Sequence, residues 1–167
     1  MTEKSRQPYS LARGEGRAFW FGAMHRVEKA DWSRTQGAFA VSEVTADAGY
    51  ATPPHVHSRE DEALYVLEGS IDVYFDGKAM SGGPGAWFFM PRGIPHSWIV
   101  GRDMPARLLI VVSPAGFERF YIEHGTPAEQ GRPARPSLTR EQVTHIMAEE
   151  YGITLTPPPP GYPVTNV

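Results

Sequence analysis

Two histidines separated by one residue, directly after two prolines, restrict the fold of this chain more than any other feature. Pro53 and Pro54 disfavour helix, so His55 and His57 are expected on extended chain. Residues i and i+2 of a strand face the same side. The pattern therefore predicts a strand whose two imidazoles point toward one place.

A carboxylate follows at the start of an apolar segment. Glu62 precedes the run Ala63–Leu67, and on a strand it shares a face with Leu64 and Val66. A charge among apolar neighbours is costly unless it is paired or bound to a metal. Two imidazoles and one carboxylate on adjacent strands are suitable ligands for a divalent transition metal.

A third histidine lies downstream, after a strand and a turn. Within residues 85–96, Pro91 and Gly93 occupy positions that suit a type I turn, and His96 begins the strand that follows. On that strand His96 and Trp98 share a face. His96 is therefore the fourth candidate ligand.

Two stretches have the residue types and spacing of the two cupin sequence motifs. They are Gly49-x5-His55-x-His57-x4-Glu62-x6-Gly69 and Gly85-x5-Pro91-x-Gly93-x2-His96. The second motif of the cupin superfamily usually ends in Asn, where this chain has Val100, but that Asn is not a ligand. The resemblance implies that His55, His57, Glu62 and His96 bind one divalent transition metal ion. Iron, manganese, nickel, cobalt, copper and zinc all accept such ligands, so the metal stays open.

The remainder of the chain is rich in short strands and turns. With 17 glycines and 16 prolines, it predicts an all-β sandwich or barrel. Strands are expected over residues 19–27, 37–45, 71–75 and 107–113, in addition to those of the two motifs, with a hairpin turn at Asp76-Gly77. The resemblance implies a double-stranded β-helix, or jelly-roll barrel, with short C-terminal helices.

The chain is expected to form one domain with two appendages. Residues 1–14 are predicted as a flexible arm, 15–125 as the barrel, and 126–167 as an extension with one helix and a Pro-rich tail. Thr139–Gln142 has the pattern of a capping box, which would start a helix that ends near Tyr151.

Composition excludes several classes of function. The net charge of −3 comes without a basic cluster, so no nucleic-acid partner is expected. The absence of cysteine excludes disulfides and thiolate ligands. The longest aliphatic run, Leu108–Val112, is too short to span a membrane. Without an apolar signal segment at the start, the expected location is the cytoplasm.

A wider resemblance suggests an activity. Residues 20–22, 37–40, 60–69, 91–96 and 113–118 together resemble small bacterial single-cupin proteins similar to quercetin 2,3-dioxygenase. This resemblance implies a metal-dependent dioxygenase, an oxidoreductase that cleaves a flavonol-like or other enolisable hydroxy-ketone substrate with dioxygen. Glu62 would be both a metal ligand and the general base that takes the substrate's hydroxyl proton. In an apolar barrel its pKa is expected to be raised, which would help that role.

Four aromatic residues are candidate walls of a pocket for a flat substrate: Phe39, Trp98, Phe117 and Phe120. Ordinary core packing is the alternative for each of them. Of the carboxylates beside Glu62, neither Glu60 nor Asp61 is expected in the site.

Two other functions use the same barrel. One is a metal-dependent isomerase, cyclase or lyase, which needs no oxygen, and the other is a non-catalytic module that binds a metal or small ligand. The expected partners are a small-molecule substrate, dioxygen and a second copy of the chain. The strand with Trp20 and Phe21 is the candidate for pairing in such a homodimer, because sheet edges need covering.

Overall fold

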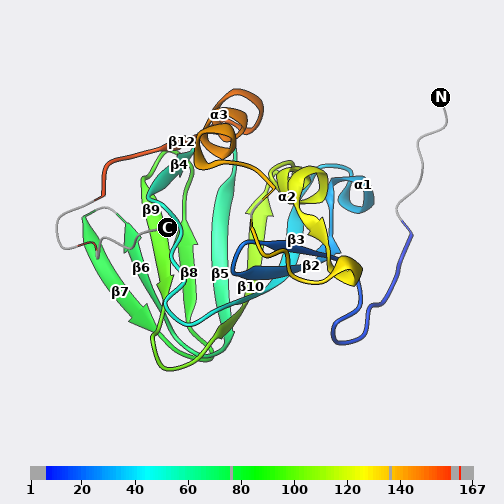
Figure 1. Cartoon of the computed structure of the whole chain (residues 1–167), viewed down its shortest axis with the longest axis horizontal. Helices are drawn as coiled ribbons and strands as arrows, with labels where there is room; N and C mark the ends of the chain where they lie inside the picture. The colour runs from blue at the N-terminus through cyan, green and yellow to red at the C-terminus, as the bar shows by residue number, and fades with distance from the viewer. Residues whose placement is uncertain (1–6, 76, 136, 159–161, 163–167) are drawn as a thin grey trace.

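Two antiparallel sheets form the body of the protein, as the prediction of an all-β jelly roll requires (Figure 1). The computed structural model describes residues 7–75, 77–135, 137–158 and 162. The larger sheet has seven strands and the smaller has five, and their inner faces enclose one core.

In both sheets, strands that are far apart in the sequence lie next to each other. The larger sheet contains, in order, β11 (Thr126–Pro127), β1 (Arg17–Phe21), β2 (Met24–Ala30), β3 (Ala40–Ala46), β10 (Ala106–Ser113), β5 (Asp61–Glu68) and β8 (Trp87–Met90). The smaller contains β12 (Ile153–Leu155), β4 (His55–His57), β9 (His96–Val100), β6 (Ile71–Phe75) and β7 (Lys78–Gly82). The two predicted motif strands therefore lie side by side, as β4 and β9.

Helical segments lie outside the sheets. They are α1 (Trp32–Thr35), α2 (Glu118–His124), the 3-10 turn η1 (Ala128–Gln130) and α3 (Arg140–Tyr151). Helix α3 lies beside β12 and β4 at one end of the barrel (Figure 1). No helix in the described part of the chain is both long and apolar enough to cross a membrane.

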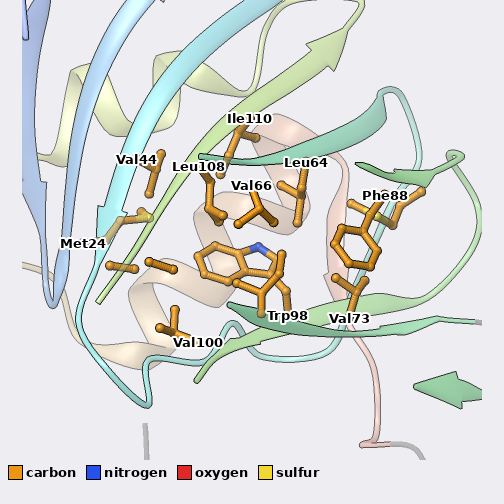
Figure 2. Close-up of a cluster of buried hydrophobic side chains, with 14 of the residues drawn as sticks. Met24, Val44, Leu64, Val66, Val73, Phe88, Trp98, Val100, Leu108 and Ile110 are labelled. Carbon is orange, nitrogen blue, oxygen red and sulfur yellow. The ribbon is translucent and has the colours of Figure 1, made fainter. Parts of the chain in front are cut away.

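The core forms because strand residues alternate between the inside and the outside of the barrel. Along β10, Leu108 and Ile110 point inward, and Leu109 between them is only half-buried. Figure 2 shows Trp98 surrounded by such side chains, among them Val66, Leu108 and Val100. Each fully buried aliphatic side chain contributes about 1.5–3 kcal/mol to folding.

The first predicted strand is wrong in one respect. Residues 19–27 belong to two strands, because Gly22 adopts a φ of 59° and the chain reverses between β1 and β2.

The connection after β2, expected as a turn, contains the short helix α1, which Asp31 caps by accepting a hydrogen bond from the Arg34 amide. The hairpin expected at Asp76-Gly77 connects β6 and β7, which pair as predicted, although Asp76 itself lies outside the described residues.

The C-terminal extension contributes to both sheets. Thr126–Pro127 pairs with β1, and Ile153–Leu155 pairs with β4, the strand of the first two histidines. The capping box at Thr139 is confirmed, and α3 ends at Gly152 in the left-handed conformation. Of the predicted Pro-rich tail, residues 159–161 and 163–167 lie outside the described residues.

At the other end of the chain, the predicted arm has no helix or strand in its described part, residues 7–14. Residues 1–6 lie outside that part. Tyr9 contacts the barrel, because its hydroxyl donates to the carbonyl of Lys29 at 2.7 Å.

The strand proposed for dimer contacts is not a sheet edge. Strand β1 lies between β2 and β11, and the Phe21 ring packs against Phe120 and Tyr121. Exposed aromatic side chains occur instead on β5 and β8, at Tyr65, Trp87 and Phe89. The homodimer stays a prediction.

Two glycines provide a matched test of the close backbone contact at the connection between β5 and β6. Gly69, between β5 and β6, and Gly49 both have a φ of 75°, but only at Gly69 would a Cβ lie 2.5 Å from the Pro105 carbonyl oxygen. Gly49→Ala is expected to cost about 1–2 kcal/mol of unfolding free energy through backbone strain alone. Gly69→Ala adds overpacking, for a total of about 2–5 kcal/mol. Urea denaturation measures both, and equal losses would contradict the close contact.

Candidate metal centre

Four side chains from three strands converge inside the barrel. His55 and His57 lie on β4, His96 on β9 and Glu62 on β5, and one ligand atom of each lies within 4.8 Å of the others. His55 pairs with His96 across the smaller sheet, whereas Glu62 comes from the larger one. His57, Glu62 and His96 are buried, and His55 is half-buried. The structure thus brings together the four residues that the sequence predicts as ligands.

Each imidazole is oriented by a hydrogen bond at Nδ1. The acceptors are the Pro53 carbonyl for His55 (2.7 Å), the Ile94 carbonyl for His96 (2.9 Å) and the Glu60 carboxylate for His57 (3.2 Å). Carbonyl and carboxylate oxygens only accept, so Nδ1 of each ring carries a proton. In the neutral rings of His55 and His57 the lone pair is then on Nε2, whereas Nε2 of His96 also faces an acceptor, Glu62, and would give up its proton to a bound metal.

The Nε2 atoms face the carboxylate of Glu62. Its Oε2 lies 3.0 Å from Nε2 of His96 and 3.8 Å from Nε2 of His57. Among the described residues, Nε2 of His57 is buried without a hydrogen-bond partner. An unsatisfied buried nitrogen is costly, and a cation held by the cluster would remove that cost. The donor set of three imidazoles and one carboxylate fits a divalent transition metal.

The electrostatics of the cluster favour a neutral His55 and a charged Glu62. Burial, together with the neighbouring His96 and His57, lowers the pKa of His55 to about 3. Burial raises the pKa of Glu62, but the hydrogen bond from His96 and the charges of the three histidines outweigh it, and the pKa falls to about 2. The expectation of a raised pKa for Glu62 is therefore wrong, because it considered the apolar barrel without the three imidazoles.

His96 has the opposite shift. Burial lowers its pKa, but the hydrogen bond and the charge of Glu62 together raise it above the ordinary value. At His96, protons therefore compete with a metal more strongly than at an ordinary imidazole.

Glu60 was expected outside the site and instead supports it. Its side chain is buried, at 4% exposure, and its Oε2 contacts Nδ1 of His57. A carboxylate in this position orients the imidazole and makes it a better ligand. Glu60 has the same strand parity as Glu62, and this signal in the sequence could have identified it.

Asp61 has a different role. It points away from the cluster and forms a bidentate pair with Arg92, with Nε at 3.0 Å and Nη2 at 2.8 Å, and it also accepts from the Arg92 amide. The side-chain bond from Arg92 lowers the pKa of Asp61 to about 2. Since Arg92 belongs to the turn before β9, this pair fixes the segment that leads to His96.

An apolar cavity adjoins the cluster. Its volume is about 320 Å³, and His55 and Glu62 form part of its wall, so a molecule in the cavity would contact the cluster directly. Helix α3 contributes Val143 and Met147 to the wall. A volume of this size is within the usual range for small-molecule sites.

The four predicted pocket residues separate into two pairs. Trp98 and Phe117 line the cavity, and the Phe117 ring also packs edge-on against the His57 ring, with centroids 5.2 Å apart. Phe39 does not line it, because it lies before β3 with 42% of its surface exposed. Phe120 is fully buried behind Phe117, against Tyr151. The structure therefore places Trp98 and Phe117 in the wall of this cavity, and Phe39 and Phe120 outside it.

Comparison with known proteins identifies related sequences. Residues 42–112 match the family model described as Cupin domain. Over 142 residues, 85% of this chain, the sequence is 27% identical to quercetin 2,3-dioxygenase of Bacillus subtilis. The chain spans 41% of the length of that protein.

Solved structures with the same fold have names that refer to different chemistries. The polyketide cyclase RemF from Streptomyces resistomycificus has a TM-score of 0.57 at 23% identity, over 81% of this chain and 89% of its own. A predicted oxalate decarboxylase from Thermotoga maritima has a TM-score of 0.60 at 16% identity, over 64% of this chain and 99% of its own. These likenesses show the fold, and the fold alone does not select a reaction.

The contact between Glu60 and His57 leads to a prediction about metal affinity. Glu60→Gln removes the charge that orients the ring, so Zn²⁺ affinity is expected to fall about 10- to 100-fold. Competition with a chromophoric chelator measures it. Glu68→Gln is the control, since it removes a carboxylate from the surface end of the same strand, away from the cluster. Equal affinities for Glu60→Gln and wild type would show that Glu60 has no role in binding.

The lowered pKa of His55 predicts how the metal-free protein responds to pH. Between its folded value of about 3 and its ordinary 6.5, the unfolded chain binds a proton that the folded chain does not. Stability therefore decreases as the pH falls through this window. Wild type is expected to lose unfolding free energy between pH 6.5 and about 5, and in His55→Asn this loss should be about 1–2 kcal/mol smaller.

Denaturation at the two pH values tests this. His145→Asn, which changes an exposed histidine of α3, should leave the loss as it is. If His55→Asn lost as much unfolding free energy as wild type, the lowered pKa of His55 would be contradicted.

Proposed function

Because the chain contains a cupin domain over residues 42–112 and has the cupin fold, we propose that it is a metal-dependent dioxygenase of the quercetinase type. Its substrate would be a flavonol-like or other enolisable hydroxy-ketone. One observation carries the proposal. Three imidazoles anchored at Nδ1 present Nε2 to one carboxylate, beside an apolar cavity that can hold a ring compound.

The metal would be held by His55, His57, Glu62 and His96. The nitrogen and oxygen donors suit a divalent transition metal without selecting one. When bound, the ion supplies Lewis-acid polarisation of a substrate oxygen and access to one-electron chemistry with dioxygen.

Glu62 would act on the substrate's proton. Its Oε2 is directed at His96, whereas its Oε1 has no hydrogen-bond partner among the described residues, and the residue lines the cavity. The lowered pKa keeps the carboxylate unprotonated at neutral pH, as a proton acceptor must be. The same lowered pKa makes Glu62 a weaker base, since a general base works best when its pKa is near the working pH. We assign to Oε1 the acceptance of the hydroxyl proton.

The cavity walls would orient the substrate and exclude water. Trp98 and Phe117 offer flat faces for a ring compound, and the Phe117 edge contacts a ligand imidazole. An apolar site strengthens the electrostatic interactions within it. The similarity to quercetin 2,3-dioxygenase supports this choice of substrate class, over the part of that protein that the chain matches.

Oxygen uptake by the metal-loaded protein tests the proposal. Quercetin and acetylacetone, a flavonol and a small diketone, are offered at an oxygen electrode, and consumption in proportion to product is expected for at least one of them. Conversion without oxygen uptake would favour the isomerase, cyclase or lyase. Stoichiometric metal with no conversion of either compound would favour the non-catalytic module.

The role of Glu62 has its own test. Glu62→Gln keeps the shape and the three histidines but removes the basicity, so metal should be partly retained while kcat falls by about 10²- to 10⁴-fold. Glu68→Gln, a change on the same strand but at the surface, is the control and should turn over at the wild-type rate. Glu62→Gln with wild-type turnover would exclude the base role.

A further inference from the structure

A buried ion pair contributes its arginine to the wall of the same cavity, and the proposed reaction does not use it. Arg26 on β2 is 2% exposed, and its Nε donates to Glu28 at 2.6 Å. Its Nη2 donates to Ser42 Oγ at 2.6 Å, and that hydroxyl donates to the other oxygen of Glu28, also at 2.6 Å. The three side chains form a closed network that fixes the guanidinium in place.

This guanidinium has donors left over. Of its five N–H groups, the bonds to Glu28 and Ser42 use one on Nε and one on Nη2, and Nη1 has no partner among the described residues. Arg26 lines the cavity, and its guanidinium carbon lies 4.2 Å from the centre of the Tyr121 ring. A charged donor in an apolar cavity is a strong hydrogen-bond partner for an oxygen that enters it.

Two phenols add to this group of donors. Tyr50 and Tyr121 line the cavity as well, and neither hydroxyl has a hydrogen-bond partner among the described residues. Burial raises the pKa of Tyr121 to about 12 and also raises that of Tyr50, so both stay protonated at neutral pH. The cavity therefore offers donors near Arg26 and an acceptor, Glu62, at the metal cluster.

The sheet register places these two polar groups apart. Val112 pairs with Glu62, and Ile110 pairs with Ser42, so apolar side chains of β10 lie between the cluster and the ion pair. The backbones of β5 and β2 are three strand spacings apart, about 14 Å in a flat sheet, and the facing side chains span part of this distance. A ligand that contacts both groups carries its two oxygen groups on opposite sides of an apolar body, and a fused-ring compound is of suitable size.

We propose that Arg26, Tyr50 and Tyr121 form a subsite for an anionic oxygen group of the substrate. The substrate class would be a fused-ring hydroxy compound with a carboxylate or ionised hydroxyl distant from the hydroxyl that meets the cluster. The position of that hydroxyl rests on the proposed function, whereas the subsite does not need a metal. The alternative is an ion pair that only shapes the barrel, since a buried pair is not by itself evidence of function.

Binding of two matched probes tests the subsite. They are 6-hydroxy-2-naphthoate and its neutral amide, titrated by calorimetry into the metal-loaded and the metal-free protein. The acid is expected to bind at least about tenfold more tightly than the amide, the effect of a hydrogen bond between charged groups. Because the subsite consists of protein side chains, the preference should persist without metal. Equal affinities for acid and amide in both forms would overturn the subsite.

Variants then identify the donors. Arg26→Met alone leaves Glu28 buried without its partner, so the double variant Arg26→Met/Glu28→Met is used, with apolar side chains in place of the pair. It should lose the preference for the acid while the affinity for the amide changes less than about threefold. Tyr50→Phe and Tyr121→Phe, which remove single hydroxyls, should each weaken the acid about three- to tenfold. Retention of the full preference in all three variants would overturn the assignment.

A matched control distinguishes binding at the subsite from a general effect of positive charge on the protein. Lys29→Met removes a cation from the same strand but from its outer side, where Lys29 pairs with Glu43. It should leave both affinities unchanged. The outcome is independent of oxygen uptake, because a protein that prefers the acid but consumes no oxygen would keep the subsite and lose only the dioxygenase proposal.

Discussion

The hydrogen bonds at Nδ1 of three histidines are the interactions on which the candidate metal centre depends. Two of the acceptors are main-chain carbonyls, at Pro53 and Ile94, each two residues before the histidine that it orients. The backbone that forms β4 and β9 therefore also sets the direction of the imidazoles. The fold and the site are coupled through these bonds, since a shift of register by one residue would turn the histidines out of the barrel.

The cluster is electrostatically incomplete without a cation. Among the described residues, Glu62 is the carboxylate that faces the Nε2 atoms; it accepts a hydrogen bond from His96, whereas Nε2 of His57 is buried without a partner. His57 is also the ring whose Nδ1 is held by a second carboxylate, Glu60. A divalent ion would satisfy the unpaired nitrogen and balance both charges. A molecule in the neighbouring cavity would then lie directly against that ion.

The fold and the convergence of His55, His57, Glu62 and His96 could be predicted from the sequence because they depend on local rules. Strand parity and two prolines are enough to orient His55 and His57, and spaced glycines frame the two motifs. Features that depend on contacts between distant segments were missed. Strand β12 has three residues and exists because it pairs with β4. The chain reversal at Gly22 interrupts a run that otherwise has the alternation of a single strand.

Side-chain surroundings were harder to predict than strand positions. Phe39 and Phe120 satisfy the same aromatic criterion as Phe117, but only packing between α2 and the barrel decides which ring reaches the cavity. The pKa of Glu62 was misjudged because burial and three imidazoles act in opposite directions, and the sequence does not give their relative size. Arg26 and Glu28 share a strand face, so parity alone could have indicated that pair.

The central claim is that one metal ion is bound by three Nε2 atoms and Glu62. Anomalous diffraction from crystals grown with Zn²⁺, recorded on both sides of the zinc absorption edge, tests it most directly. The account predicts one strong peak between β4, β5 and β9, about 2.0–2.1 Å from Nε2 of His55, His57 and His96 and about 2.0–2.2 Å from a Glu62 oxygen. The absence of a peak among these residues, or a zinc ion bound through Nδ1, would contradict it.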